Sequence, residues 1–278
     1  MTERMWMLED SGAQAGVLHM ERDEALAMRL LHGEPGATPV LRLYQWQPWA
    51  ISLGHHQDAA TIEQERLAAD GFDLVRRPTG GRAILHAEEL TYCVVMEAGR
   101  RSILQVYNSI SEALVRGLQL FGVEVALQKS QPQFAELYRQ PSSIPCFTSS
   151  ARYEIEWQGR KLVGSAQRRY ADGVQDVVLQ HGSILCGPAH RRLCDYLRVE
   201  SDAVREQIRK EMAEKTVDLA EITGRRVDME KLAACIRHGF EESWGIRFDA
   251  GPTAVPVLPM RQRHSENRGL TIIQPEGS

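Results

Sequence analysis

Apolar residues recur at helical spacing in several stretches of the chain. Leu18–Leu31 (LHMERDEALAMRLL) has this spacing and ends before the dipeptide His32-Gly33, where breakers follow. Tyr107–Leu120 is amphipathic, and Gly122 stands just past its end, the favoured place for a glycine cap. The other helices that we expect are Thr61–Ala69, Cys194–Leu197, Asp202–Lys215 and Asp228–Trp244.

The segments between these helices predict strands. Pro39–Leu53 (PVLRLYQWQPWAISL) alternates apolar and polar residues and predicts two short strands on either side of Pro48. Arg152–Trp157 and Lys161–Gln167, joined at Gly159-Arg160, predict a hairpin. The further strands that we expect are Phe72–Arg76, two within Ala83–Met96 with a break at Glu88-Glu89, Val123–Leu127 and Val177–Leu185.

Strands and helices mix without a regular alternation, and hairpins are frequent. This order predicts an α+β fold with a mixed, largely antiparallel sheet flanked by helices rather than a doubly wound parallel sheet. We expect one domain over residues 1–248, with a helical last part at about 190–248. Proline, glycine and charge dominate residues 249–278, which predicts a flexible C-terminal tail.

Composition is that of an ordinary globular protein, with 278 residues, 43% hydrophobic and 25% charged. The 33 Lys and Arg residues against 37 Asp and Glu leave no overall basic field. Short basic clusters such as Arg191-Arg192 are typical of solvated surface, so we expect no nucleic-acid partner.

No apolar stretch reaches the roughly 18 residues of a membrane span, and Met1–Asp10 lacks the apolar run of a signal peptide. We therefore expect a cytoplasmic protein without a membrane partner. The five cysteines are an odd number without a CxxC pair, which argues against a disulfide scaffold or a zinc ribbon. No ligand cluster indicates a metal site.

Four segments carry residue types suited to chemistry. They are Arg76–His86 (RRPTGGRAILH), Pro145–Tyr153 (PCFTSSARY), Gly159–Gln167 (GRKLVGSAQ) and Leu179–Leu185 (LQHGSIL). At these residues, and in this order, the chain resembles the biotin/lipoate protein ligase superfamily, and most closely its LipM-type octanoyltransferases. The resemblance runs from about residue 20 to about residue 250 and implies the catalytic-domain fold of class II biotin/lipoate ligases.

The glycine-rich loop of the first segment is the first candidate site. Gly80 and Gly81 accept backbone angles that let main-chain N–H groups approach a ligand, although a tight turn between strands explains them equally well. The resemblance implies that the loop lines an acyl tunnel, and that Arg82 stands where ATP-dependent ligases have a third glycine. The substrate-binding residues that we expect are Arg76, Arg77, Gly80, Gly81, Arg82, His86, Gly164, Ser165, Ala166, Gln180 and His181.

Lys161 and Cys146 are the catalytic candidates. From the residues alone, Lys161 is a strand-edge lysine or a catalyst; the resemblance gives it the position of the superfamily's catalytic lysine. Cys146 follows Pro145 in an irregular segment and precedes polar residues, whereas Cys93 and Cys235 lie in apolar or helical runs. The resemblance implies that Cys146 accepts the acyl group, with Cys186 as its nearest rival.

The resemblance implies an octanoyl transfer in two steps. The donor is octanoyl-acyl carrier protein, whose phosphopantetheine arm holds the thioester, and the acceptor is a lysine of a lipoyl domain or of the glycine-cleavage H protein. A thioester is already activated, so no cofactor, ATP or metal is expected. An acidic carrier needs basic surface at the tunnel mouth, for which Arg76, Arg77 and Arg82 are candidates.

Three other functions fit the same residues. An ATP-dependent lipoate or octanoate ligase would form an adenylate from the free acid. An octanoyl amidotransferase would move the group between two lipoyl carrier proteins with the same cysteine and lysine. A non-catalytic acyl-binding module would retain its ligand without turnover.

Overall fold

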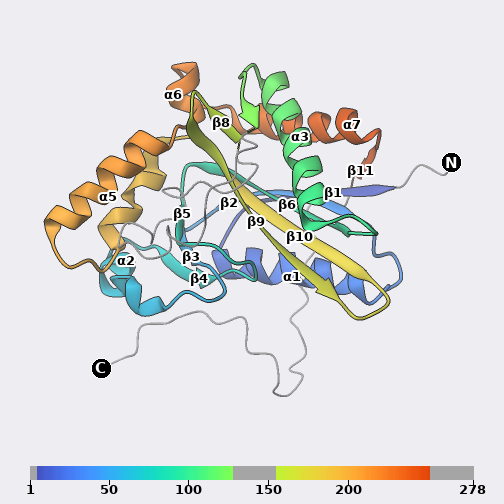
Figure 1. Cartoon of the computed structure of the whole chain (residues 1–278), viewed down its shortest axis with the longest axis horizontal. Helices are drawn as coiled ribbons and strands as arrows, with labels where there is room; N and C mark the ends of the chain where they lie inside the picture. The colour runs from blue at the N-terminus through green and yellow to red at the C-terminus, as the bar shows by residue number, and fades with distance from the viewer. Residues whose placement is uncertain (1–4, 128–154, 251–278) are drawn as a thin grey trace.

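The computed structural model describes residues 5–127 and 155–250. Its main feature is an eight-stranded sheet in the order β11-β1-β2-β6-β10-β9-β8-β7 (Figure 1). β1 pairs in parallel with β11 and β2, and the other neighbours pair antiparallel. The expected α+β fold with a mixed, largely antiparallel sheet is therefore confirmed.

A small second sheet, in the order β4-β3-β5, lies beside it. The strands are β1 Trp6–Gln14, β2 Val40–Trp46, β3 Ala50–Leu53, β4 Asp73–Arg76, β5 Ile84–His86, β6 Glu89–Glu97, β7 Ala126–Leu127, β8 Ile155–Trp157, β9 Arg160–Ala171, β10 Asp176–Leu185 and β11 Phe248–Ala250. The helices are α1 Gly16–Leu31, α2 Gln64–Ala69, α3 Ile103–Phe121, α5 Asp202–Lys215, α6 Leu219–Thr223 and α7 Met229–Trp244, with 3₁₀ helices η1 Ala59–Thr61 and η4 Pro188–Tyr196.

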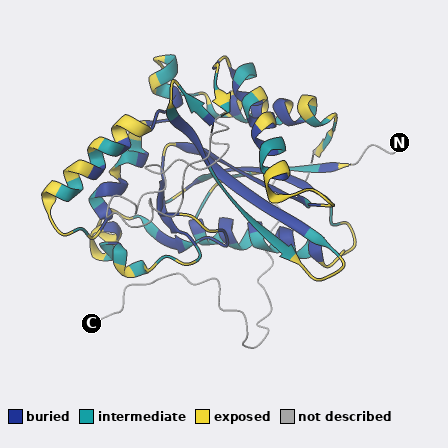
Figure 2. Cartoon of the chain, in the orientation of Figure 1, coloured by how far each residue is buried: buried dark blue, intermediate teal, exposed yellow. Residues whose placement is uncertain are grey.

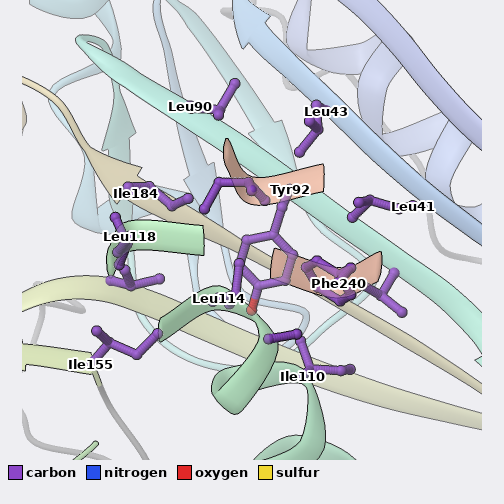
Figure 3. Close-up of a cluster of buried hydrophobic side chains, with 14 of the residues drawn as sticks. Leu41, Leu43, Leu90, Tyr92, Ile110, Leu114, Leu118, Ile155, Ile184 and Phe240 are labelled. Atoms are coloured by element: carbon purple, nitrogen blue, oxygen red, sulfur yellow. The ribbon is translucent and has the colours of Figure 1, made fainter. Parts of the chain in front are cut away.

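Helices α3 and α7 cover one face of the large sheet. Alternate residues of the strands point to this face, so that Tyr92 of β6 and Ile184 of β10 lie in one apolar cluster with Leu114 of α3 and Phe240 of α7 (Figure 3). Ser102 and Gln105 form a capping box at the start of α3, and Gly122 ends it in the left-handed conformation. We call this side the helix face.

Two glycines let α3 and α7 approach closely. A methyl group on Gly239 would lie 2.4 Å from the backbone N of Gly117 and 2.5 Å from the carbonyl O of Ala113. A methyl group on Gly117 would lie 2.7 Å from the Cα of Ile236. Neither neighbour is a flexible side chain, so these positions require glycine.

The opposite face of the large sheet is covered by α1 and the small sheet. Cys93 and Val95 of β6 point to this side and pack with Met20 and Leu30 of α1. A third apolar cluster joins the small sheet to α2, η4 and α5. Figure 2 shows the central strands buried between these layers, with exposed residues on the outer side of α5. We call the side of α1 and the small sheet the cavity face.

The helix and strand patterns predicted most elements to within a few residues, among them α1, α5, α7 and β10. α3 begins at Ile103, earlier than expected, because the capping box fixes its start. β1 and β11 were not predicted. β11 pairs with β1 and includes residues 249 and 250, which we had assigned to the tail. Residues 251–278 and the segment of Cys146 lie outside the described residues.

In residues 5–127 and 155–250, no helix combines the length and the apolar character that crossing a bilayer requires.

Candidate functional site

A cavity lies on the cavity face, between the large sheet, the small sheet and α1. Its apolar wall comes from Met20 of α1, Tyr44 and Trp46 of β2, and Ile84 of β5. Its remaining wall is formed by Ser52, Arg77, Gly81, His86, Thr91, Gly164, Ser165, Ala166, His181, Gly182 and Ser183. A cavity of this kind, largely apolar with a few polar groups, suits a small acyl ligand.

Seven of the expected substrate-binding residues line this cavity: Arg77, Gly81, His86, Gly164, Ser165, Ala166 and His181. They come from the loop after β4 and from β5, β9 and β10, so the fold brings three of the four sequence segments to one place. Four of the expected residues are not part of the lining: Arg76, Gly80, Arg82 and Gln180. Cys146 lies outside the described residues.

The guanidinium of Arg77 holds the glycine-rich loop in shape. It donates to the backbone O of Ser52 at 3.0 Å, of Gly80 at 2.9 Å and of Arg82 at 2.7 Å. Only 3% of Arg77 and 9% of Arg82 is exposed. Neither side chain can therefore serve in the basic surface patch that we expected.

Arg76 is used in the same way on the other side of the loop. Its Nη1 donates to the carbonyl oxygens of Gly54, His55 and Gln57. The turn at residues 54–57 is thereby fixed against the loop. A methyl group on Gly54 would meet the carbonyl O of Gly81 at 2.1 Å, which explains the glycine.

His86 lies in the middle of a hydrogen-bond chain in the cavity wall. Its Nδ1 lies 2.8 Å from Oε1 of Glu89, and its Nε2 lies 2.7 Å from Oγ of Ser52. Since a carboxylate only accepts, Nδ1–H donates to Glu89 and Nε2 accepts from the Ser52 hydroxyl. The Trp46 ring stacks on His86 at 3.9 Å between centroids and fixes its orientation.

Glu89 collects donors from both sheets. Its Oε1 also accepts from Thr91 at 2.6 Å and from Ser183 at 2.8 Å. Burial raises the pKa of Glu89, but His86 and the two hydroxyl donors outweigh burial, and the net pKa is lowered. The carboxylate therefore stays ionised and keeps the chain of donors aligned.

His181 forms a second chain of the same kind. Its Nδ1 donates to Oδ2 of Asp23 at 3.1 Å, and its Nε2 accepts from the Thr79 hydroxyl at 2.7 Å. Thr79 belongs to the glycine-rich loop, so this chain ties the loop to α1. Burial raises the pKa of Asp23, but Arg42 and His181 overcome that effect and bring it to about 2.

Gln180 points to the helix face. Its amide N donates to the hydroxyl of Tyr92 at 3.0 Å, and its amide O accepts from Gln167 at 3.0 Å. The family resemblance placed Gln180 among the expected substrate-binding residues. Neighbouring residues of a strand face opposite ways, which is why only His181 reaches the cavity.

Lys161 lies on β9, three residues before the cavity wall at Gly164, and is 5% exposed. Lys161 lies opposite Glu156 of β8 in the sheet. The carbonyl O of Lys161 accepts a hydrogen bond from the backbone N of Val217 at 3.1 Å. It is therefore a buried lysine and does not act as the exposed edge lysine of the alternative interpretation. A buried ammonium exerts a stronger field on nearby groups than one in water.

The four described cysteines are poor nucleophiles. Burial raises the pKa of Cys186, the nearest rival of Cys146, and the nearby carboxylates of Glu89 and Asp218 raise it further. Burial likewise raises the pKa of Cys93, Cys194 and Cys235. Because the thiolate is the reactive form, none of these four is activated for attack.

Sequence analysis missed Asp23, Ser52, Trp46 and Glu89. Asp23 had a visible signal, because it lies on the apolar stripe of α1 between Met20 and Leu26, where a polar residue is unusual. Glu89 begins a strand whose following residues are mostly apolar. Ser52 and Trp46 gave no signal, since their role depends on how the two sheets meet.

Comparison with known proteins gives a consistent result. A family model described as "Lipoyl protein ligase A/B catalytic domain" matches residues 17–241. An octanoyltransferase LipM of Kyrpidia tusciae is 38% identical over 251 residues, covering 88% of this chain and 89% of that protein. The octanoyltransferase LipM of Bacillus subtilis is 33% identical over 256 residues, covering 90% of each.

Solved structures show the same fold at lower identity. A crystal structure of lipoate-protein ligase A bound with ATP matches with a TM-score of 0.69 at 18% identity, covering 91% of this chain and 90% of that one. A bi-partite lipoate protein ligase from Thermoplasma acidophilum, described with its E2 lipoyl domain, matches with a TM-score of 0.68 at 19% identity, covering 92% and 88%.

Proposed function

This chain belongs to the lipoyl protein ligase A/B catalytic domain family, and we propose that it is an octanoyltransferase whose acyl group passes through Cys146. The observation that carries the proposal is the buried Lys161 on the strand whose next residues, Gly164–Ala166, form the cavity wall. An acyl chain in the cavity would run along this strand. The proposal assigns the ammonium group of Lys161 to the carbonyl of this acyl group.

In the first step, the Cys146 thiolate attacks the carbonyl carbon of an octanoyl thioester. The C–S bond to Cys146 forms, the C–S bond to the donor breaks, and the donor thiol leaves with a proton. Lys161 supports this step in two ways. A neighbouring cation favours the thiolate, and it stabilises the oxyanion of the tetrahedral intermediate.

In the second step, the amine of a lysine on a lipoyl domain or on the glycine-cleavage H protein attacks the acyl-Cys146 thioester. An amide forms, the amine loses a proton, and the thiolate of Cys146 is regenerated. The acyl donor is octanoyl-acyl carrier protein. Since a thioester lies above an amide in free energy, this transfer needs neither ATP nor a metal.

The nucleophile is tested by intact mass after mixing the protein with octanoyl-carrier protein. The wild type should gain one octanoyl group, and Cys146→Ala should gain none. Cys186→Ala is the matched control and should still be acylated. An adduct that persists in Cys146→Ala, or one that disappears in Cys186→Ala, would refute the assignment.

The role of Lys161 is tested by the rate of the same acylation. Loss of an oxyanion-stabilising group costs roughly 100- to 1000-fold, so Lys161→Ala should acylate that much more slowly. Lys215→Ala removes an exposed lysine that pairs with Glu211 and should acylate at the wild-type rate. Equal rates in the two variants would contradict the role of Lys161.

The ligase alternative is tested with free octanoate, ATP and a lipoyl-domain acceptor. The buried Arg82, which stands in place of a third glycine in the loop, favours the transferase. We expect product from octanoyl-carrier protein without ATP, and none from octanoate with ATP. The reverse pattern would make the protein a ligase.

A further inference from the structure

The cavity opens where its lining reaches the surface. Gly81 is exposed, and Ser165 and Ala166 are partly exposed, whereas the other lining residues are buried. The mouth of the cavity therefore lies between the glycine-rich loop and β9. A donor whose acyl chain occupies the cavity has to leave through this mouth.

Arg168 stands on the β9 side of the mouth. Side chains two apart on a strand share a face, so Arg168 follows Ala166 on the cavity side. Its Nη1 donates to the backbone O of Pro78 in the glycine-rich loop at 3.0 Å. Its neighbour Arg169 instead pairs with the carboxylate of Asp176 at 3.0 Å. Arg168 thus places a guanidinium at the mouth, and its hydrogen bond to a neutral carbonyl leaves its positive charge uncompensated by that partner.

The ring of Tyr170 lies between Arg168 and the carboxylate of Glu24. The guanidinium of Arg168 lies over the Tyr170 ring, 4.7 Å from its centroid, and the Tyr170 hydroxyl donates to Glu24 at 3.3 Å. The ring therefore separates the arginine from this acid, which leaves the guanidinium available to an anion.

His55 and its neighbour His56 lie beside the glycine-rich loop, which forms the other side of the mouth. The backbone N of His55 donates to the carbonyl O of Thr79 at 2.9 Å, and the two imidazole centroids are 4.8 Å apart. Nδ1 of His55 is buried and has no hydrogen-bond partner among the residues that the structure describes. Partial burial lowers the pKa of His55, and the nearby charges of Arg168, His56 and Arg76 lower it further against the opposing effect of Glu24.

We propose that the phosphate rim, defined as Arg168, His55 and His56, binds the phosphate of a phosphopantetheine-linked acyl donor. The proposal rests on the proposed function and names the part of the donor that is recognised. When the acyl chain lies in the cavity, the pantetheine arm passes through the mouth, and its phosphate is the first charged group outside. Guanidinium and imidazole N–H groups are strong donors to phosphate oxygens.

The rim replaces the basic patch that the sequence suggested. Arg77 and Arg82 are buried, the Arg77 guanidinium is bonded within the loop, and Arg76 is bonded to three backbone carbonyls. Arg76 and Arg77 shape the loop, and Arg168 provides the charge. Sequence analysis did not find Arg168 because it lies 90 residues from its partner Pro78.

The test compares octanoyl-pantetheine with octanoyl-4′-phosphopantetheine as donors for the full-length protein. A charge-assisted hydrogen bond changes binding about tenfold or more, so kcat/KM should be higher for the phosphorylated donor by that factor. The advantage should shrink as salt is added, because the contact is near the surface. Equal kcat/KM for the two donors would overturn the proposal.

Variants locate the effect. Arg168→Gln should bring the ratio of the two kcat/KM values close to one, and Arg168→Lys should keep part of it. Arg169→Gln removes the same charge one residue further along the strand and should keep the full ratio. A wild-type ratio in Arg168→Gln would overturn the assignment to this rim.

Binding without turnover separates this proposal from the proposed function. Free 4′-phosphopantetheine should bind the wild type more tightly than pantetheine, whether or not any acyl group is transferred. Preferential binding without transfer would support the phosphate rim and refute the transferase. Transfer without preferential binding would support the transferase and refute the phosphate rim. Octanoyl-CoA and octanoyl-carrier protein share this phosphate, and the one with the higher kcat/KM identifies the source of the donor.

Discussion

On the helix face, α3 and α7 lie so close that only glycine fits at two contact positions, Gly117 and Gly239. The cluster beneath these helices is almost entirely apolar. On the cavity face of the same sheet, α1 and the small sheet leave room for a cavity and bury ion pairs and histidines in its wall. The two faces share strands β2, β6 and β10, whose alternate residues serve one side or the other.

The interior is held together by close packing on the helix face and by hydrogen bonds on the cavity face. Close packing makes the helix face a support that tolerates little change in volume. The cavity face keeps open space for a ligand, so its walls cannot be fixed by packing alone. Directional hydrogen bonds that Asp23 accepts from His181 and Glu89 accepts from His86 hold those walls in place. We therefore expect charge changes to damage one face and volume changes to damage the other.

The largest effect is expected for Asp23→Ala. Asp23 is fully buried and accepts from Arg42 at 2.7 Å, from the Tyr44 hydroxyl at 3.0 Å and from His181. Its removal leaves the Arg42 guanidinium buried without this partner, which costs about 3–5 kcal/mol of unfolding free energy. Urea unfolding measures the loss.

The control for that experiment is Glu24→Ala on the same helix. Glu24 is only partly buried, and its contact is a 3.3 Å hydrogen bond from Tyr170. Its loss should cost less than about 1 kcal/mol. A comparable loss for the two variants would show that the ion pairs do not hold the cavity face.

On the helix face, the matching change is Gly239→Ala. In an open helix this substitution would stabilise the protein by about 1 kcal/mol. Here the new methyl group would lie 2.4 Å from the backbone of Gly117, and overpacking of this kind costs about 1–3 kcal/mol. The sign of the change in unfolding free energy therefore decides whether close packing governs this face. Ser243→Ala, at an exposed position of α7, should stay within about 0.5 kcal/mol of wild type.

The two faces also differ in what the sequence reveals. The apolar spacing of α3 and α7 was enough to predict both helices, because close packing depends on a repeating pattern. The wall of the cavity depends on single residues that meet from distant segments. Thr79 and His181, for example, are 102 residues apart, and no local pattern joins them. Glycine and lysine positions of the site came from the family motifs, and their partners came only from the structure.

The third prediction concerns His19 in acid. Neutral His19 donates from Nε2 to the carbonyl O of Gln45 at 2.7 Å and accepts at Nδ1 from Arg42 at 2.7 Å. Burial and the Arg42 charge lower its pKa from 6.5 to about 4. Below pH 6.5, His19 is protonated in the unfolded chain, whereas in the folded protein it stays neutral until about pH 4. Stability is therefore lost as the pH falls through this window, by about 1.4 kcal/mol per pH unit.

His19→Gln should remove that share of the slope of unfolding free energy against pH. His238→Gln on α7 is the control, since that side chain is 51% exposed and belongs to the helix face. It should leave the slope as it is in the wild type. If the two variants have the same slope, acid sensitivity does not arise from the cavity face.

The smallest effect is expected at Tyr92, which lies between the two faces. Its ring packs in the apolar cluster of the helix face (Figure 3). Its hydroxyl forms hydrogen bonds with Ser165 at the cavity mouth, at 2.6 Å, and with Gln180, at 3.0 Å. Tyr92→Phe keeps the packing and removes only these bonds, so unfolding free energy should fall by about 1 kcal/mol. Tyr107→Phe removes a longer bond, 3.2 Å, to the backbone O of Ser165 and should cost less. A loss for Tyr92→Phe as large as that for Asp23→Ala would mean that the helix face, too, depends on buried polar bonds.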